Sequence, residues 1–274
     1  MHSAASDGTD SPKELLEKVQ EAGISCFSLT DHDTIEGVEE IEPLIPEGIT
    51  FIRGIEFSCI TGAGKCHILG YGYDKDNASF RALIEEGARR RVEKLNKRVR
   101  YLKEEFGIVL DDSDIAELNK VKRVGKTHLG NLLVMKGIEK DKNTAIEKYI
   151  TPCPTGIDRL EGEETIRVIL EAGGVPVWAH PLGGTGEAPI SLEDFKNQLK
   201  LLKKAGLIGL ECFYSKYGAE EIGLLTSFVG AEGLLISGGS DYHGKNKTVK
   251  LLTLNAAGFP VGDEKLTVLQ KLKP

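Results

Sequence analysis

The sequence has 274 residues with a formal net charge of −7, and 40% of the residues are hydrophobic. This length suits one large domain or a barrel with an insertion, because a chain of this size buries about three quarters of its unfolded surface. No apolar run approaches the roughly 20 residues that span a bilayer, and the acidic balance argues against binding extended duplex nucleic acid, so both function classes are set aside.

Short apolar runs alternate with amphipathic helical patterns in the first part of the chain. A helix begins at Ser11 and Pro12, where the serine caps the first turn and the proline starts it, and it ends at Gly23. A second helix closes at Pro46. Strands are predicted at residues 24–29, 49–55 and 67–73. This alternation is typical of repeated βα units around a parallel sheet or barrel.

The middle third of the sequence has helical patterns without a convincing strand. Apolar residues recur at helical spacing from Phe80 to Phe106, and helical patterns continue from Asp114 to Tyr149. We therefore predict a helical insertion domain at residues 74–150. It interrupts a barrel domain formed by residues 1–73 and 151–274.

The insertion begins with a basic helix. Between Arg89 and Lys103 there are eight Lys or Arg residues and a single acidic residue, Glu93. A solvated helix face explains most of these side chains, while one or two of them could hold an anionic substrate.

The alternation of helices and strands resumes after the insertion. Helices are predicted at residues 163–172, 192–205 and near 220–231. Strands are predicted at residues 175–179, 207–211 and 234–237. The fold class is therefore α/β.

The five cysteines are odd in number and scattered along the chain. The first residues also lack the basic and apolar regions of a signal peptide, so we expect reduced thiols and a cytoplasmic location. Cys59 and Cys66 flank Glu56 and His67, but their spacing does not match a structural zinc site.

Polar side chains lie near the ends of the predicted strands. In a parallel α/β barrel the carboxyl ends of the strands meet on one face, so these groups should converge there. Their imidazoles and carboxylates suit several divalent transition ions, with zinc, manganese or iron favoured over calcium. The candidate metal ligands are His2, Asp7, His32, Glu56, His67, His180, Asp241 and His243.

Each candidate also has a purely structural interpretation. Asp31 and Asp33 could cap the helix that follows them, and Asp7 could cap a turn. His180 could be an ordinary loop histidine before a proline, and the groups in the last glycine-rich turn could satisfy the backbone. Five histidines on one predicted face favour metal binding, because no structural need places them together.

The motifs in this sequence resemble the polymerase and histidinol phosphatase (PHP) superfamily of metal-dependent phosphoesterases. They occur in family order along the chain: MHSAASDG, LTDHDTIEG, GIEFS, the histidine of CHILGYGY, AHPLG and SGGSDYHG. The resemblance implies a distorted seven-stranded (β/α)7 TIM-like barrel with two or three divalent metal ions. By position, Glu56 would bridge two metals, one held also by His2 and Asp241 and the other by His67 and His180. A third would be held by Asp7, His32 and His243.

The branch of the family that is most similar carries a helical insertion and a Gly-Arg-Pro-His-like motif, here residues 125–128. It acts on nucleotide phosphomonoesters, including 5′-AMP and 3′,5′-bisphosphates, and some members trim RNA 5′ ends. We therefore predict hydrolysis of nucleotides or short 5′-phosphorylated oligonucleotides by a metal-activated hydroxide. His180, Asp241 and His128 are the catalytic candidates, with Lys126, His128 and Arg91 binding substrate and Tyr214 and Tyr217 available to stack on a base.

The sequence departs from the family pattern at its first motif. The first histidine of the family's His-x-His is absent, so we expect the first strand of the barrel to be missing and one metal to lack a ligand. In the insertion motif Lys126 and Thr127 replace arginine and proline. Two alternatives follow, a histidinol-phosphate phosphatase and a non-catalytic metal- or nucleotide-binding module.

Overall fold

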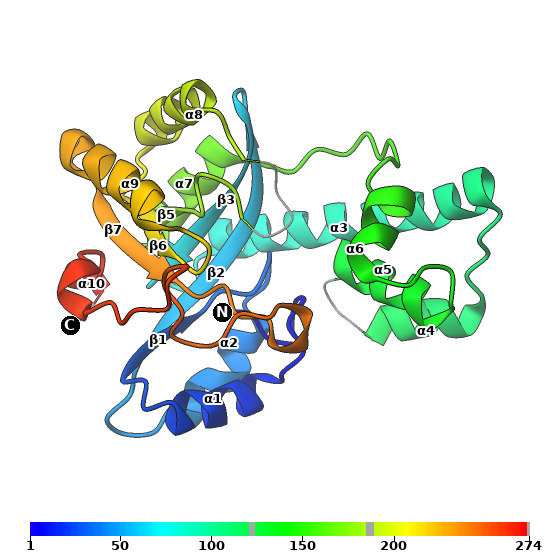
Figure 1. The fold of residues 1–274 in the computed structure, drawn as a ribbon, viewed down its shortest axis with the longest axis horizontal. Coiled ribbons are helices and arrows are strands. Elements are labelled where there is room, and N and C mark those ends of the chain that lie inside the picture. Colours follow the sequence, from blue (N-terminus) through cyan, green and yellow to red (C-terminus); the bar gives the residue numbers. More distant parts are fainter. Residues whose placement is uncertain (121–123, 185–188, 273–274) are drawn as a thin grey trace.

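The computed structural model describes residues 1–120, 124–184 and 189–272. A curled mixed sheet forms the body of these residues, with helices packed along it (Figure 1). Its strands run in the order β1-β2-β3-β5-β6-β7, and the short β4 pairs with β2. The bounds are β1 Cys26–Leu29, β2 Thr50–Thr61, β3 Gly64–Tyr71, β4 Leu160–Glu161, β5 Val175–Ala179, β6 Gly209–Tyr214 and β7 Leu235–Gly239.

The sheet is mixed, so the expectation of a wholly parallel barrel is wrong at β3. This strand runs antiparallel to both β2 and β5. Only Gly62 and Ala63 separate β2 from β3. Two residues close a hairpin, whereas a parallel connection needs a crossover of a dozen or more.

Five helices accompany the strands of the body. They are α1 Pro12–Glu21, α2 Glu36–Ile41, α7 Gly162–Glu171, α8 Leu192–Ala205 and α9 Ala219–Glu232. Their apolar faces bury Leu15, Val38, Ile166 and Phe195 in the main hydrophobic core, together with Phe57 of β2. Each such side chain contributes about 1.5–3 kcal/mol when it is fully buried.

Helix α1 begins where the sequence predicts it. The Ser11 side chain accepts the N–H of Glu14 at 3.2 Å, and the Glu14 carboxylate accepts the N–H of Ser11 at 2.8 Å. This reciprocal capping box satisfies two of the helix's terminal donors. The capping box fixes where helix α1 begins, so the irregular N-terminal segment covers residues 1–10.

The inserted helices surround a second hydrophobic core. They are α3 Ala78–Phe106, α4 Asp112–Lys120, α5 Lys126–Met135 and α6 Lys142–Ala145, followed by a π-helical turn at Ile146–Ile150. The long α3 contributes Phe80 to the main core and Leu102 to the second core, where Leu129 and Ile150 meet it. Figure 1 shows α4, α5 and α6 gathered at the far end of α3, away from the sheet. We propose the domain division at residues 74 and 150 on this basis.

The first residues of the chain lie between the two ends of the sheet. The carbonyl of Met1 accepts the N–H of Thr30, just after β1, and the N–H of His2 donates to the carbonyl of Tyr242, just after β7. His2 therefore lies where the loops after β1 and β7 meet. The missing first strand stays a prediction.

The remaining described elements are short. They are 3-10 turns at Glu42–Leu44, Gly244–Asn246 and Asp263–Lys265, and helix α10 at Leu269–Leu272. None of the helices in the described parts of the chain combines the length and apolar character that crossing a bilayer requires. The cytoplasmic location stays a prediction.

Candidate metal centre

The side chain of Glu56 lies at the middle of the candidate centre. Its Oε2 is 3.1 Å from His2 Nε2, and its Oε1 is 2.7 Å from His67 Nδ1 and 3.1 Å from His180 Nε2. Asp241 Oδ1 lies 3.4 Å from the same His2 nitrogen. Each oxygen of Glu56 thus faces a different set of ligand atoms, which is the arrangement that a bridging carboxylate needs.

A second group of ligand atoms lies beside the first. Asp7 Oδ1 is 3.1 Å from His243 Nε2, 3.9 Å from His2 Nδ1 and 4.0 Å from His32 Nε2. Among the described residues, three groups offer ligand atoms within 4.8 Å of one another: His2, Asp7, His32 and His243; His32, Glu56 and His67; and His2, Glu56 and Asp241. The structure therefore brings all eight predicted ligands together, counting His180 beside Glu56.

Several buried atoms of this cluster have no hydrogen-bond partner within the described residues. They are His2 Nδ1 and His32 Nδ1, together with Asp7 Oδ1 and His243 Nε2, which face each other as an ion pair at 3.1 Å but not in hydrogen-bond geometry. Burying a polar atom without a partner is costly, so native proteins rarely leave such atoms together. Imidazole nitrogens and carboxylate oxygens are ligands of zinc, manganese and iron. The donor set therefore fits divalent transition ions.

The charges within the cluster are strongly perturbed. Burial disfavours the protonated form of His2, but hydrogen bonds to Asp241 and Glu56 outweigh it and raise the pKa of His2 to about 9. Burial lowers the pKa of His32 to about 3. The pKa of Glu56 is held well below its usual range, because the neighbouring imidazoles outweigh its burial. A carboxylate that stays ionised at neutral pH is ready to bind a cation.

The sequence predicts Glu56 and His67 at strand ends, whereas the structure places both of them within long strands. β2 continues five residues beyond Glu56 to Thr61, and His67 pairs with Ser58 of β2 and Ala179 of β5. The sequence pattern predicts the end of β2 at residue 55 and so misses its continuation through Cys59, Ile60 and Thr61.

Asp31 and Asp33 have other roles than the predicted helix caps. The residue that caps α2 is Ile35, which provides no side-chain hydrogen bond. The Asp31 carboxylate instead contacts the N-terminal segment, and Asp33 Oδ1 accepts the N–H of Ser58 at 2.8 Å. Both aspartates are therefore parts of the site's surroundings.

Glu211 is a site residue that the sequence analysis missed. It lies in β6, is 5% exposed, and its Oε2 accepts the backbone N–H of His180 at 2.8 Å. Burial raises the pKa of Glu211 to about 7. The strand-end rule that selected His180 applies equally to Glu211, so the signal was present in the sequence.

Tyr214 and Tyr217 are not available to stack on a base. Tyr214 is fully buried and donates its hydroxyl proton to Asp241 Oδ2 at 2.9 Å. Tyr217 is 4% exposed, and its hydroxyl accepts the N–H of Leu182. Both rings are buried and their hydroxyl groups are used within the fold, so the prediction of a stacking surface is wrong.

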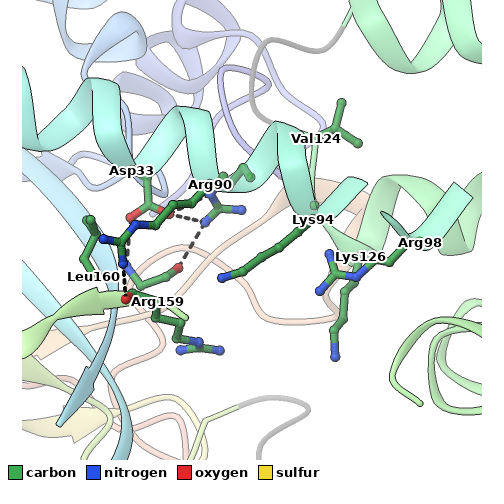
Figure 2. A pocket seen from close by; sticks show the side chains of 12 residues that line it. Asp33, Arg90, Lys94, Arg98, Val124, Lys126, Arg159 and Leu160 are labelled. Atoms are coloured by element: carbon green, nitrogen blue, oxygen red, sulfur yellow. Dashed lines mark hydrogen bonds and ion pairs between the residues drawn. The ribbon is translucent and has the colours of Figure 1, made fainter. Parts of the chain in front are cut away.

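Figure 2 shows a basic pocket whose lining includes Asp33, next to His32 in the sequence, and Ser58, which pairs with His67, so the pocket lies beside the candidate ligands. It has a volume of about 620 Å³ including its open mouth, and Asp33 is the one carboxylate among the described residues that line it. Arg91 is anchored on two residues that lie next to candidate ligands. Its guanidinium contacts Oδ2 of Asp33, which follows His32, at 2.5–2.6 Å, and Oγ of Ser58, which pairs with His67, at 3.0 Å. The cations that line the pocket are Arg90, Arg91, Lys94, Arg98, Lys126 and Arg159.

The pocket concentrates positive charge. Burial, followed by the neighbouring guanidinium groups, lowers the pKa of Lys94 and of Lys126 to about 8. The Nε of Arg98 is buried without a hydrogen-bond partner in the described structure. An anion in this pocket would relieve the repulsion among these groups.

Four of the eight cations of the basic helix are exposed, and the other four, Arg90, Arg91, Lys94 and Arg98, line the pocket. Arg89 pairs with Glu86 and Glu93. Arg90 donates to the carbonyl of Arg159 at 2.6 Å, and Lys94 donates to the carbonyl of Asp158 at 3.1 Å. These contacts hold residues 155–159 against α3, which places Arg159 at the pocket.

His128 lies at the start of α5, outside the three groups of ligand atoms found among the described residues. Its Nδ1 accepts the N–H of Gly125 at 3.1 Å, so the neutral ring carries its proton on Nε2. Burial lowers the pKa of His128, and the charges that act on it are those of Asp7 and Arg91. Lys126 donates to Thr151 Oγ1 at 3.0 Å and lines the pocket.

Comparison with known proteins agrees with this site. The model of the PHP domain matches residues 1–151. A 3′,5′-nucleoside bisphosphate phosphatase of Chromobacterium violaceum is 28% identical over 88% of this chain and 85% of its own length. A 5′-3′ exoribonuclease of Haemophilus influenzae is 32% identical over 66% of this chain and 67% of its own length.

The fold has a counterpart among solved structures. A metal-dependent phosphoesterase from Bifidobacterium adolescentis aligns with a TM-score of 0.78 and 27% identity, over 94% of this chain and 91% of that one. The family match covers more than half of the 274 residues, and it contains five of the eight predicted ligands. The chain therefore belongs to the PHP family and is a metal-dependent phosphoesterase.

Proposed function

We propose that this protein hydrolyses phosphate esters of nucleotides and prefers substrates with a second phosphate group, such as 3′,5′-bisphosphates or short 5′-phosphorylated oligonucleotides. The observation that carries the proposal is the basic pocket beside the metal centre. A phosphomonoester needs one anion site at the metals, whereas six lysines and arginines form a further one next to it. The names of the two relatives, a bisphosphate phosphatase and an exoribonuclease, support the same substrate class.

The eight ligands would hold the metal ions, with Glu56 between two of them. Divalent ions bound there supply Lewis acidity at the phosphoryl group and lower the pKa of bound water. The buried position of His2, His32 and His243, at 1% to 14% side-chain exposure, excludes bulk water from this chemistry. The chain requires no serine or cysteine nucleophile.

The residues between the metals and the pocket would orient the substrate. Arg91 is held in a fixed direction by Asp33 and Ser58 through Nε and Nη2, and its remaining nitrogen, Nη1, can bind a phosphate oxygen. His128, whose neutral ring carries its proton on Nε2, is suited to donate a hydrogen bond to an oxygen of the phosphate ester. Lys126 would bind the second phosphate.

The test is phosphate release by the metal-loaded protein, with metal content measured on the same sample. We expect turnover of adenosine 3′,5′-bisphosphate and of short 5′-phosphorylated RNA, slower turnover of 5′-AMP, and none of histidinol phosphate. Full metal occupancy without release from any nucleotide would refute the proposal and favour a binding module. Preferential hydrolysis of histidinol phosphate would favour that alternative enzyme.

A pocket variant tests the second phosphate directly. Arg98→Met should raise KM for the bisphosphate about tenfold, because one charge-assisted contact is lost, and leave KM for 5′-AMP nearly unchanged. The matched control is Arg100→Met, an exposed arginine on the same helix that does not line the pocket. Equal effects of the Arg98 substitution on both substrates would contradict a separate phosphate site.

A further inference from the structure

The Asp31 carboxylate is fully buried and its hydrogen bonds all come from one segment. Its Oδ1 accepts the backbone N–H of Ser3 at 2.7 Å and the hydroxyl of Ser6 at 2.6 Å. Its Oδ2 accepts the hydroxyl of Ser3 at 2.6 Å. Within the described residues, the carboxylate accepts no hydrogen bond from a lysine or arginine side chain. A buried negative charge is thus stabilised by the N-terminal segment alone.

The helix beside Asp31 is built to leave room for this contact. Gly37 of α2 lies against it, and a Cβ at that position would be 2.4 Å from Asp31 Oδ2 and 2.8 Å from Ser3 Oγ. A larger residue would push the carboxylate and the serine apart. The close packing keeps water away from the three hydrogen bonds.

The segment that Asp31 holds carries two candidate metal ligands but no helix or strand. Ser3 follows His2, and Ser6 precedes Asp7. Within the segment, the N–H groups of Ser6 and Gly8 both donate to the carbonyl of Ser3, at 3.1 and 2.9 Å. The position of this loop therefore depends on Ser3, and the position of Ser3 depends on Asp31.

We infer that Asp31 is a positioning residue of the metal centre, which sets His2 and Asp7 at the distances that their two metal groups require. The inference rests on the metal-binding part of the proposed function. His2 offers ligand atoms both to the group with Glu56 and Asp241 and to the group with His243, and Asp7 belongs to the latter. One carboxylate thus aligns ligands of two different groups through the two serines that adjoin them.

The geometry separates this role from a direct one. Both Asp31 oxygens already accept hydroxyl or amide protons, and Asp31 is in none of the ligand groups found in the described residues. Partners that orient metal ligands typically change metal affinity about 10- to 100-fold when they are replaced. A residue that serves stability alone changes the unfolding temperature without that effect.

The experiment compares Asp31→Asn with the unchanged protein by two measurements. In metal-free protein, hydrogen exchange of the amides of residues 2–8 should become faster, while exchange in β5 and β6 stays the same. In titrations with Mn²⁺ and with Zn²⁺, the affinity should fall about 10- to 100-fold. The matched control is Asp114→Asn, which removes a buried carboxylate that contacts Lys136 in the insertion and should leave both measurements unchanged.

A milder variant keeps the test decisive if the Asn variant does not fold. Ser6→Ala removes only the 2.6 Å hydrogen bond to Asp31 and should weaken metal binding about tenfold. Metal affinity within twofold of the unchanged protein in the folded variants overturns the inference, even where exchange is faster. Absence of metal binding by the unchanged protein overturns it as well. Tight metal binding without nucleotide hydrolysis refutes the proposed substrate and leaves the role of Asp31 standing.

Discussion

Replacing Glu56 tests the central arrangement of the metal centre. In Glu56→Gln the side chain keeps its size but loses its charge, and one of its ends becomes an amide N–H₂. Three imidazole nitrogens lie within 3.1 Å of the Glu56 oxygens, from His2, His67 and His180. The amide N–H₂ cannot accept from these rings or bind a cation, so the group on that side loses a ligand, while the group on the other side keeps only a neutral amide oxygen in place of a carboxylate.

The expected effect follows from these contacts. Loss of a shared ligand should lower the binding affinity for two metal ions by about a hundredfold or more. This is at least the effect expected from losing a residue that only orients ligands. Without metal the variant should be less stable by about 3–5 kcal/mol at pH 7, the cost of breaking a buried charged contact. The pKa of Glu56 is depressed in the folded protein, so this difference should shrink as pH falls below the ordinary glutamate pKa.

The assay is metal content by mass spectrometry after dialysis against buffered Mn²⁺ or Zn²⁺. Two fewer ions per chain should remain in Glu56→Gln. The control Glu42→Gln removes a carboxylate that pairs with Arg53 and Lys75 outside the ligand groups, and should retain all of its metal. Unchanged metal content in Glu56→Gln would refute the bridging role.

Two further predictions concern groups outside the ligand set. In metal-free protein, Glu211→Gln should gain stability over the unchanged protein as pH rises from 4.5 to 7. The folded pKa of Glu211 is raised to about 7, and each unit above the unfolded value costs about 1.4 kcal/mol of stability, which is roughly 3 kcal/mol in all. If the unfolding free energies of the two proteins in urea depend on pH in the same way, this prediction is contradicted. Leu102→Ala should destabilise the inserted helices by about 2–5 kcal/mol, because Leu102 is fully buried in the second core. The metal content at saturating Mn²⁺ should stay the same. A loss of bound metal would show that the two cores are coupled.

The elements that the sequence predicts best are those in which pattern and environment agree. The strand at Val175–Ala179 and the helix at Leu192–Ala205 have the predicted bounds. The strand is buried on both faces and therefore continuously apolar, and the helix starts at a serine cap and ends at Gly206 in a left-handed conformation. In both elements, residues within the element or directly beside it determine where it begins and ends.

The direction of β3 and the roles of charged side chains were not predictable in the same way. Strand direction depends on the length of the connection at Gly62 and Ala63, which the pattern placed in a longer loop. The basic helix illustrates the second point, since Arg90 and Lys94 bind carbonyl groups of residues 158–159, more than 60 positions away. Charge density along a sequence indicates an anion site but does not tell which cations are already used by the fold.

The strand-end motifs could be recognised from the sequence as candidate ligands, but the way their backbone is held could not. Asp33, His180 and Asp241 have left-handed backbone conformations, with φ of 51°, 30° and 53°. Each such conformation costs a side-chain-bearing residue about 1–3 kcal/mol unless its surroundings enforce it.

A neighbouring segment restrains each of these three residues. The Ser58 N–H and Arg91 hold Asp33, and the Glu211 carboxylate holds the N–H of His180. The Tyr214 hydroxyl and Lys247 Nζ hold Asp241 at 2.9 and 2.6 Å. These partners come from β2, α3, β6 and the last loop, so the strained turns are tied to the sheet and to the inserted helix together. A change in the insertion that moves Arg91 should therefore reach His32 through Asp33, which gives the helical insertion a direct route to the metal centre.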